Sequence, residues 1–280
     1  MTTPPTRMVA MDIDGTVTDS NHAVRPAVRA AIVAALDRGL EVLLATGRVL
    51  RTTRPVVDAI DPRLGAILNN GAAAFERLDA PALWYSLVPA EVAREVVDCL
   101  TELGLPAYVF DAEDKVIAVP DIEALPPVFR GRFGDMLRGV GDVRSWIADD
   151  PLMVTTLAGD SRAAEALVKE QTRVLGERFA GRATVSPLWH PLYGSWILDF
   201  IAPDVSKWWA LCRYAALRGI EPSAILAIGD GLNDVPMVSA AGLGVAMGQS
   251  CPELLAVADV VVADNDHDGV AEAIERYVLA

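Results

Sequence analysis

The chain has 280 residues, of which 52% are hydrophobic and 22% are charged, and its formal net charge is −14. This composition excludes a disordered chain, and the acidic balance argues against nucleic acid as a partner, because binding to phosphate backbones requires a basic surface. At about 150 residues per domain, the length predicts two domains.

The first ninety or so residues alternate short apolar runs with longer helical patterns, which is typical of a parallel sheet built from strand–helix–strand units. The expected strands are 8–11, 41–45 and 66–68, and the expected helices are 26–38 and a segment that begins near 49. Because ligands bind outside the carboxyl ends of such strands, the turns that follow them should lie on one edge of the sheet.

The first of these turns carries the sequence Asp12-Ile13-Asp14-Gly15-Thr16. Two carboxylates separated by one residue at a strand end suit a divalent cation such as Mg2+. The same pair can supply a nucleophile and a neighbouring acid or base. Taken alone, the pattern also fits a solvated turn.

The next turn carries Thr46-Gly47-Arg48. A hydroxyl and a backbone amide at this place can hold phosphoryl oxygens while negative charge moves onto them. A Thr-Gly pair alone has no diagnostic value, so this turn gains meaning only together with the others.

Between residues 86 and 188 the pattern changes to a compact α+β insertion. The expected helices are 89–103 and 161–175, and the expected strands are 107–110, 115–119, 152–157 and 183–186. The insertion contains no recognisable catalytic set. We therefore expect a catalytic core of residues 1–85 and 189–280 and an inserted cap of residues 86–188.

Some weaker signals leave alternatives open. Arg130, Arg132 and Arg138 of the insertion could form an anion site, although an exposed basic stripe is the favoured interpretation. His22 and His190 could contact a substrate, although a surface or hinge role is favoured for each.

After residue 189 the first pattern resumes, with expected strands at 195–201, 224–228, 244–246 and 260–262 and expected helices at 207–217 and 267–279. Lys207 begins the first of these helices, and its ammonium is suited to hold a phosphoryl oxygen. Residues 229–234 read Gly-Asp-Gly-Leu-Asn-Asp, where Asp230 can ligate a metal ion and Asn233 and Asp234 lie on the following turn. A solvated lysine and an ordinary glycine loop are the plain alternatives.

These four segments, in this order, resemble the motifs of the haloacid dehalogenase (HAD) superfamily of phosphatases. A cap between the second and third motifs is similar to the Cof-type branch, which also includes sucrose-phosphate phosphatase and phosphomannomutase. The resemblance covers nearly the whole chain. It implies an α/β fold with a Rossmann-like parallel-sheet core and an inserted α+β cap domain.

The resemblance also implies catalytic and metal-binding roles. Asp12 would attack phosphorus and form an aspartyl-phosphate, while Asp14 would protonate the leaving alcohol and then activate water. Mg2+ would be held by Asp12, the backbone carbonyl of Asp14, and Asp230. Asn233 and Asp234 would support this site closely.

The substrate-binding residues implied by the resemblance come from three of the motifs. Thr46 and Lys207 would bind the phosphoryl oxygens, and Gly47, Arg48 and Asn233 would complete the substrate site. Residues 69–71, which follow the third strand, differ from the pattern usual in relatives, and this difference concerns local substrate contacts.

The expected function is Mg2+-dependent hydrolysis of a small phosphorylated metabolite, with a sugar phosphate as first choice and a nucleotide-like or cofactor phosphate as a further option. We expect a cytoplasmic protein that has neither nucleic acid nor a membrane as a partner, since no run reaches the ~18 apolar residues of a membrane span. Two alternatives stay open: a phosphomutase of the phosphomannomutase type, and a non-catalytic phosphate- or metal-sensing module. The sequence does not determine the oligomeric state.

Overall fold

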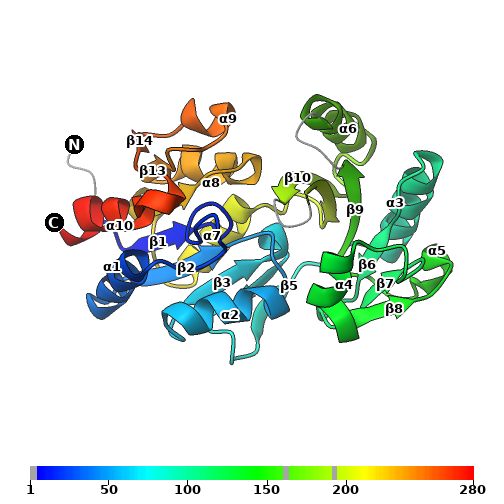
Figure 1. The fold of residues 1–280 in the computed structure, drawn as a ribbon, viewed down its shortest axis with the longest axis horizontal. Coiled ribbons are helices and arrows are strands. Elements are labelled where there is room, and N and C mark those ends of the chain that lie inside the picture. The colour runs from blue at the N-terminus through cyan, green and yellow to red at the C-terminus, as the bar shows by residue number, and fades with distance from the viewer. Residues whose placement is uncertain (1–4, 160–163, 191–193) are drawn as a thin grey trace. The chain divides into compact units, whose positions relative to one another are not determined.

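The structure is a computed structural model that describes residues 5–159, 164–190 and 194–280. The chain forms two compact units, each built around its own sheet (Figure 1). The first unit comprises the chain up to Trp84 together with Ser206–Ala280, and the second unit comprises Tyr85–Val205. The second unit is therefore an insertion in the first.

The sheet of the first unit has eight strands, and the six from β14 to β3 in its spatial order run parallel to one another. In spatial order the strands are β14 (Val260–Val261), β13 (Leu243–Ala246), β12 (Ile225–Gly229), β1 (Met8–Met11), β2 (Glu41–Ala45), β3 (Gly65–Leu68), β4 (Ala73–Phe75) and β5 (Ala82–Tyr85). The strand β4 pairs antiparallel with β3. The predicted α/β fold with a parallel-sheet core is confirmed.

Helices connect these strands and cover the sheet (Figure 1). They are α1 (Pro26–Asp37), α2 (Leu50–Ile60), α7 (Lys207–Ala216), α8 (Val235–Ala240), α9 (Pro252–Leu255) and α10 (Gly269–Ile274), which continues into a π-helical turn at Glu275–Leu279. The start and end of α1 follow from its sequence. Pro26 stands at its first position, where no backbone N–H is needed, and Gly39 just after it has a φ of +80°.

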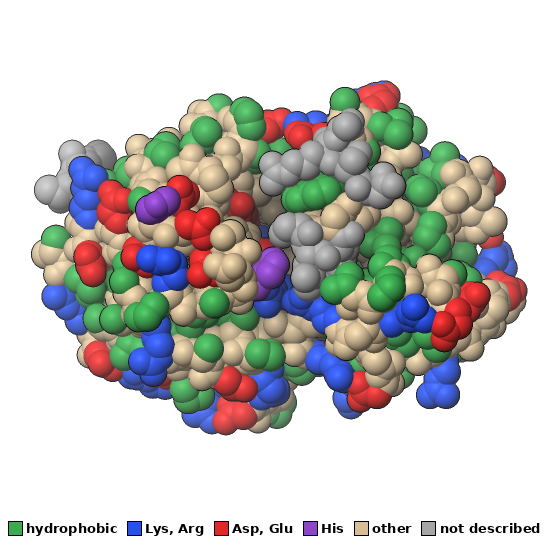
Figure 2. All heavy atoms as spheres, in the orientation of Figure 1, with side chains coloured by type: hydrophobic (Ala, Val, Ile, Leu, Met, Phe, Trp, Pro, Cys, Tyr) green, Lys and Arg blue, Asp and Glu red, His purple; other side chains and the backbone are tan. Residues whose placement is uncertain are grey.

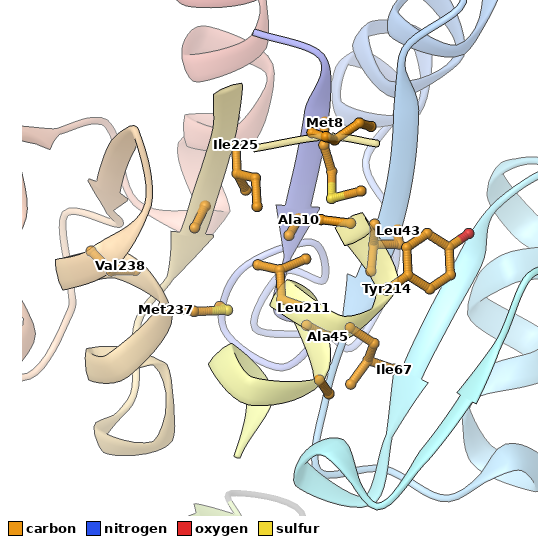
Figure 3. Close-up of a cluster of buried hydrophobic side chains, with 14 of the residues drawn as sticks. Met8, Ala10, Leu43, Ala45, Ile67, Leu211, Tyr214, Ile225, Met237 and Val238 are labelled. Carbon is orange, nitrogen blue, oxygen red and sulfur yellow. The ribbon is translucent and has the colours of Figure 1, made fainter. Parts of the chain in front are cut away.

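A hydrophobic cluster lies between the sheet and the helices α7 and α8 (Figure 3). It contains residues of β1, β2, β3 and β12 on the sheet side and residues of α7 and α8 on the helix side. The labelled members are Met8, Ala10, Leu43, Ala45, Ile67, Leu211, Tyr214, Ile225, Met237 and Val238. Packing in this cluster fixes where α7 begins relative to the strand ends.

The sheet of the second unit has six strands. In spatial order they are β10 (Thr184–His190), β11 (Ser195–Ile201), β9 (Met153–Gly159), β6 (Tyr108–Phe110), β7 (Ile117–Val119) and β8 (Leu137–Gly139). All neighbours in this sheet are antiparallel except β7 and β8. The helices of this unit are α3 (Ala90–Glu102), α4 (Pro127–Phe133), α5 (Val143–Trp146) and α6 (Glu165–Arg178).

The boundaries of the two units differ from the predicted ones at the second junction. We expected the core to resume at residue 189, but the structure assigns the chain up to Val205 to the second unit. The reason is β11, which pairs antiparallel with β10 and β9. The strands β4 and β5 were not predicted from the sequence. The first residues of the expected helix 161–175 lie outside the residues that the structure describes.

The surface carries charges of both signs. On the face shown in Figure 2, acidic and basic side chains of the described residues are interspersed rather than gathered into one basic stripe. Among the helices that the structure describes, none is long and apolar enough to cross a bilayer.

Candidate active site

The predicted motif residues follow strands that end at the same edge of the first sheet. The strand β1 pairs in register with β2 and with β12 along its whole length. The backbone N–H of Asp12 donates to the Ile228 carbonyl at 3.0 Å, and that of Thr46 donates to the Ile67 carbonyl at 2.9 Å. The turns after these strands therefore meet at the carboxyl edge, where parallel sheets bind ligands.

Lys207 reaches this edge because α7 begins there. The Ser206 hydroxyl oxygen accepts a hydrogen bond from the backbone N–H of Trp209 at 3.1 Å and so caps the helix. Leu211 and Tyr214, on the buried face of α7, pack in the hydrophobic cluster. Lys207 is thereby held at the first position of the helix, with its side chain fully buried.

The Lys207 ammonium bridges two carboxylates. Its Nζ donates to Oδ1 of Asp12 and to Oδ1 of Asp234, each at 2.6 Å. Burial lowers the pKa of Lys207, but the charges of Asp12 and Asp234 outweigh burial and hold the pKa above its ordinary value. Lys207 is thus a buried cation, and the alternative of a solvated helix residue is wrong.

Two carboxylates of the site are destabilised in their charged form. Burial raises the pKa of Asp12 to about 7, although the charge of Lys207 opposes this rise. Burial also raises the pKa of Asp230 well above its ordinary value, and the charges of Asp12 and Asp234 add to the effect. One ammonium therefore faces three neighbouring carboxylates, and the site has an excess of negative charge.

The loop that carries Asp230 is fixed by its neighbours. Oδ2 of Asp234 accepts the backbone N–H groups of Asp230 at 3.1 Å and Gly231 at 3.0 Å. The Thr16 hydroxyl donates to Oδ1 of Asp230 at 3.2 Å. A Cβ at Gly15 would lie 2.3 Å from Oδ2 of Asp230, so only glycine permits this approach of the two loops.

These carboxylates form a candidate site for a divalent cation. Asp12, Asp230 and Asp234 each offer an oxygen within 4.8 Å of the others. Both oxygens of Asp234 already accept hydrogen bonds, from Lys207 and from the backbone. Asp12 and Asp230 are therefore the residues suited to ligate the ion, and a cluster of carboxylate oxygens suits a hard cation.

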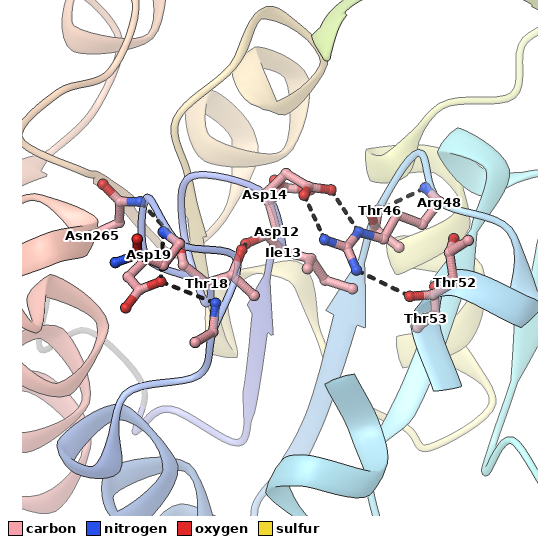
Figure 4. A network of polar contacts seen from close by, with 12 residues as sticks. Asp12, Ile13, Asp14, Thr18, Asp19, Thr46, Arg48, Thr52, Thr53 and Asn265 are labelled. Atoms are coloured by element: carbon pink, nitrogen blue, oxygen red, sulfur yellow. Dashed lines mark hydrogen bonds and ion pairs between the residues drawn. The ribbon is translucent and has the colours of Figure 1, made fainter. Parts of the chain in front are cut away.

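Asp14 and Arg48, which the sequence assigned to different roles, form an ion pair (Figure 4). The guanidinium donates from Nη2 to Oδ1 of Asp14 at 2.5 Å and from Nε to Oδ2 at 2.7 Å. Arg48, which was expected to bind substrate, thus contacts the carboxylate of the predicted acid/base.

The other predicted substrate-binding residues lie on the same edge. Thr46 is buried, and its Oγ1 accepts the backbone N–H of Arg48 at 3.1 Å. Gly47 lies between them in the turn. Asn233 donates from Nδ2 to Oδ1 of Asn70 at 2.9 Å, so it links the Asp230 loop to the turn after β3.

Sequence reasoning missed Gln249. Its Nε2 donates to the Gly15 carbonyl at 2.5 Å and holds the loop that follows Asp12. No local signal marked Gln249, because its partner is far away in the chain. The role of Thr16 as a partner of Asp230 was also missed, although Thr16 belongs to the first motif.

Of the weaker candidates, one belongs to the first unit and two belong to the second. His22 lies in an exposed loop, where it adopts a φ of +59°. Arg130 forms an ion pair with Glu123 within the second unit. His190 ends β10 of the second unit and is buried there.

Comparisons with known proteins identify a family and several relatives. A family model described as haloacid dehalogenase-like hydrolase matches residues 9–274. The chain is 26% identical, over 99% of its length, to the chloroplastic endoribonuclease YBEY of Arabidopsis thaliana, but it spans only 47% of that protein. It is 24% identical, over 98% of its length and 99% of the relative, to the pyridoxal phosphate phosphatase YbhA of Escherichia coli (strain K12).

A solved structure extends the comparison to the fold. The haloacid dehalogenase-like hydrolase from Bacteroides thetaiotaomicron superposes with a TM-score of 0.77 and 24% identity. The match covers 97% of this chain and 99% of that one, so both units are included. At this identity the match supports the fold alone.

Proposed function

The chain belongs to the haloacid dehalogenase-like hydrolases, the family predicted from its motifs, and on this premise we propose that it is a Mg2+-dependent phosphatase of small phosphorylated metabolites with Asp12 as nucleophile. The observation that carries the proposal is the buried Lys207 ammonium, which lies 2.6 Å from both Asp12 and Asp234. Beside them Asp230 completes a cluster of carboxylates at the strand ends.

The reaction proceeds in two displacements. In the first, an oxygen of Asp12 attacks phosphorus, the bond from phosphorus to the ester oxygen breaks, and Asp14 gives its proton to the leaving alcohol. In the second, a water molecule attacks the aspartyl-phosphate, Asp14 takes a proton from this water, and the bond from phosphorus to Asp12 breaks. Inorganic phosphate and the unmodified enzyme result.

Charge is the main obstacle that the site must overcome. A carboxylate and a phosphate oxygen are both negative, and two like unit charges 4 Å apart repel by about 4 kcal/mol at an effective dielectric constant of about 20. Lys207 offsets this repulsion, since it is a fixed cation next to Asp12. The Thr46 hydroxyl and the backbone of Gly47, at the same edge, hold the phosphoryl oxygens.

The residues fit a magnesium ion. Asp12 and Asp230 supply carboxylate oxygens, and the backbone carbonyl of Asp14 is the third protein ligand of the proposal. The excess negative charge of the cluster and the close approach of Asp230 to Gly15 support this assignment. When bound, the ion supplies Lewis-acid neutralisation of the phosphoryl oxygens.

Mg2+ is expected to raise the melting temperature of the protein, because it binds the folded carboxylate cluster and not the unfolded chain. Replacing Asp230 by Asn should remove most of this shift, since one of the two suited carboxylates is lost. Thermal melts with and without Mg2+ check the expectation. The matched control is Asp79→Asn, which changes an exposed carboxylate and should keep the shift. Equal shifts in both variants would contradict the metal assignment.

The substrate class is tested with a panel of phosphorylated metabolites. The named activity of the Escherichia coli relative supports pyridoxal phosphate, and the resemblance of the motifs supports a sugar phosphate. We expect release of inorganic phosphate from at least one of these two classes in the presence of Mg2+ and none in the presence of EDTA. Release that EDTA does not change, or no release from any compound, would contradict the proposal. The ribonuclease name of the plant relative gives no support here, because the chain spans 47% of that protein.

The same assay separates the alternatives. A phosphomutase would return an isomeric ester with little free phosphate, and it would need a second phosphate site. Several arginines of the second unit are instead held in ion pairs, namely Arg144 with Asp98, Arg178 with Glu102, and Arg182 with Glu95. A non-catalytic module would bind an ester without changing it.

The second unit is proposed to select the substrate, as expected for the inserted cap. Every residue to which the proposal gives a chemical role belongs to the first unit. The second unit is therefore proposed to recognise the variable part of the substrate. The cytoplasmic location and the lack of a nucleic-acid partner stay predictions from composition.

A further inference from the structure

We infer that Arg48 is a positioning residue for Asp14 and not a substrate-binding residue. The inference rests on the proposed function, because it takes Asp14 as the group that transfers the proton. It changes the role that the resemblance implied for Arg48, and it follows from what the guanidinium contacts.

The contact between Arg48 and Asp14 is a two-point contact. Nη2 and Nε of the guanidinium each donate to a different oxygen of the carboxylate, at 2.5 Å and 2.7 Å. Because the guanidinium and the carboxylate are both planar, a two-point contact between them fixes the orientation of the carboxylate as well as its position. The Arg48 side chain is only 8% exposed, so water competes weakly for these hydrogen bonds.

Arg48 is itself held from three sides (Figure 4). Its Nη1 donates to the backbone carbonyl of Thr52, in the first turn of α2, at 3.0 Å. Its backbone N–H donates to Thr46 Oγ1 at 3.1 Å, and its carbonyl accepts the backbone N–H of Asn69 at 3.0 Å. Each of the three guanidinium nitrogens therefore donates to a protein oxygen, which holds the guanidinium in place.

The carboxylate that Arg48 orients lies in the turn after β1. Asp14 follows the end of β1 and precedes Gly15, whose φ of +80° turns the chain sharply. An aspartate side chain has several accessible rotamers, and the two hydrogen bonds from the Arg48 guanidinium select one of them. Preorganisation of this kind acts on the rate of the chemical step and leaves substrate binding nearly unchanged. A lysine cannot replace it, since a single ammonium does not fix the plane of the carboxylate.

The test compares Arg48→Lys with the wild type on two esters, p-nitrophenyl phosphate and pyridoxal phosphate. The first has a leaving group that departs readily as an anion, whereas the alcohol of the second must be protonated. We expect kcat for pyridoxal phosphate to fall roughly 10²-fold with little change in KM, and kcat for p-nitrophenyl phosphate to fall much less. If pyridoxal phosphate is not turned over, the best alkyl phosphate from the panel takes its place.

Two further variants separate positioning from mere structural support. Arg48→Ala should regain part of its kcat when guanidinium ion is added at a concentration that leaves the wild type unaffected. In an Asp14→Asn background, Arg48→Lys should lower kcat little further, because both changes remove the same function. Arg51→Ala is the matched control and should keep full activity, because Arg51 is an exposed arginine in the first turn of α2.

The outcomes are distinct. An increase in KM with kcat unchanged would overturn the inference and return Arg48 to substrate binding. Equal losses on both esters, with no rescue by guanidinium and full additivity with Asp14→Asn, would also overturn it, since they indicate a structural role. If Asp14→Asn alone leaves the alkyl phosphate activity intact, the acid/base role of Asp14 in the proposed function fails, and the inference fails with it. If Asp14→Asn loses activity while Arg48→Lys does not, only the inference fails.

Discussion

Replacing Asp12 by Asn is expected to lower kcat roughly 10⁴-fold or more, because an amide oxygen cannot form the covalent intermediate. The variant should keep the wild-type fold. The amide oxygen can still accept the hydrogen bond that Lys207 donates to Oδ1 of Asp12 in the wild type. The loss of activity can therefore be separated from a loss of structure.

The pH dependence of stability strengthens this separation. Burial raises the pKa of Asp12 from 3.8 to about 7 in the folded state. A carboxyl group with a raised folded pKa binds more protons when folded, so its contribution to stability falls as the pH rises from about 4 to about 7. The variant lacks this group, and without metal at about pH 8 it should melt no lower than the wild type.

Steady-state kinetics and thermal melts of both proteins check this expectation. Asp58→Asn, on the exposed side of α2, is the matched control and should keep both activity and stability. If Asp12→Asn retained more than about a tenth of the wild-type kcat with a natural substrate, the role of Asp12 as nucleophile would be untenable.

Replacing Lys207 by Met should damage stability and catalysis together. The change leaves Asp12 and Asp234 buried without their shared cation, and breaking a buried ion pair in this way costs about 3–5 kcal/mol. The melting temperature should fall by on the order of 10 °C for a protein of this size. Of the molecules that remain folded, kcat should fall roughly 10²–10³-fold, because a fixed positive charge beside the phosphoryl group is lost.

The chain offers a matched control for this variant, since it has only three lysines. Lys115 and Lys169 form exposed ion pairs with Glu113 and Glu165. Lys115→Met should therefore change stability by no more than about 1 kcal/mol and leave activity intact. If Lys207→Met had the melting temperature and kcat of Lys115→Met, the assignment of Lys207 as a buried cation at the active site would be wrong.

At lower pH the melting temperature of Lys207→Met should approach that of the wild type, because the unpaired carboxylates become protonated.

The four motifs could be predicted from the sequence because each is a local signal. Asp12, Thr46 and Asp230 directly follow short buried strands, so both the strand and the polar turn are visible within a few residues. The parallel sheet follows from the same alternation. Their convergence at one edge is then a consequence of parallel strands and needs no further information.

The partners within the site could not be predicted, because they depend on contacts between distant residues. The ion pair of Arg48 with Asp14 joins two turns whose separation along the chain gives no hint of a contact. The burial of Lys207 depends on the way α7 packs on the sheet, and a helix start looks the same in sequence whether it is buried or solvated. The strand β11 could have extended either sheet, since its apolar pattern does not specify a partner.

The covalent intermediate on Asp12 is the central claim, and trapping it is the most direct measurement. The enzyme is quenched in acid during turnover, digested at low pH, and analysed by mass spectrometry for a phosphorylated peptide. We predict phosphate on the peptide that contains Asp12, present only with substrate and Mg2+, and absent in the Asp12→Asn variant. Phosphate on a different residue, or a phosphopeptide that persists in Asp12→Asn, would contradict the proposed mechanism.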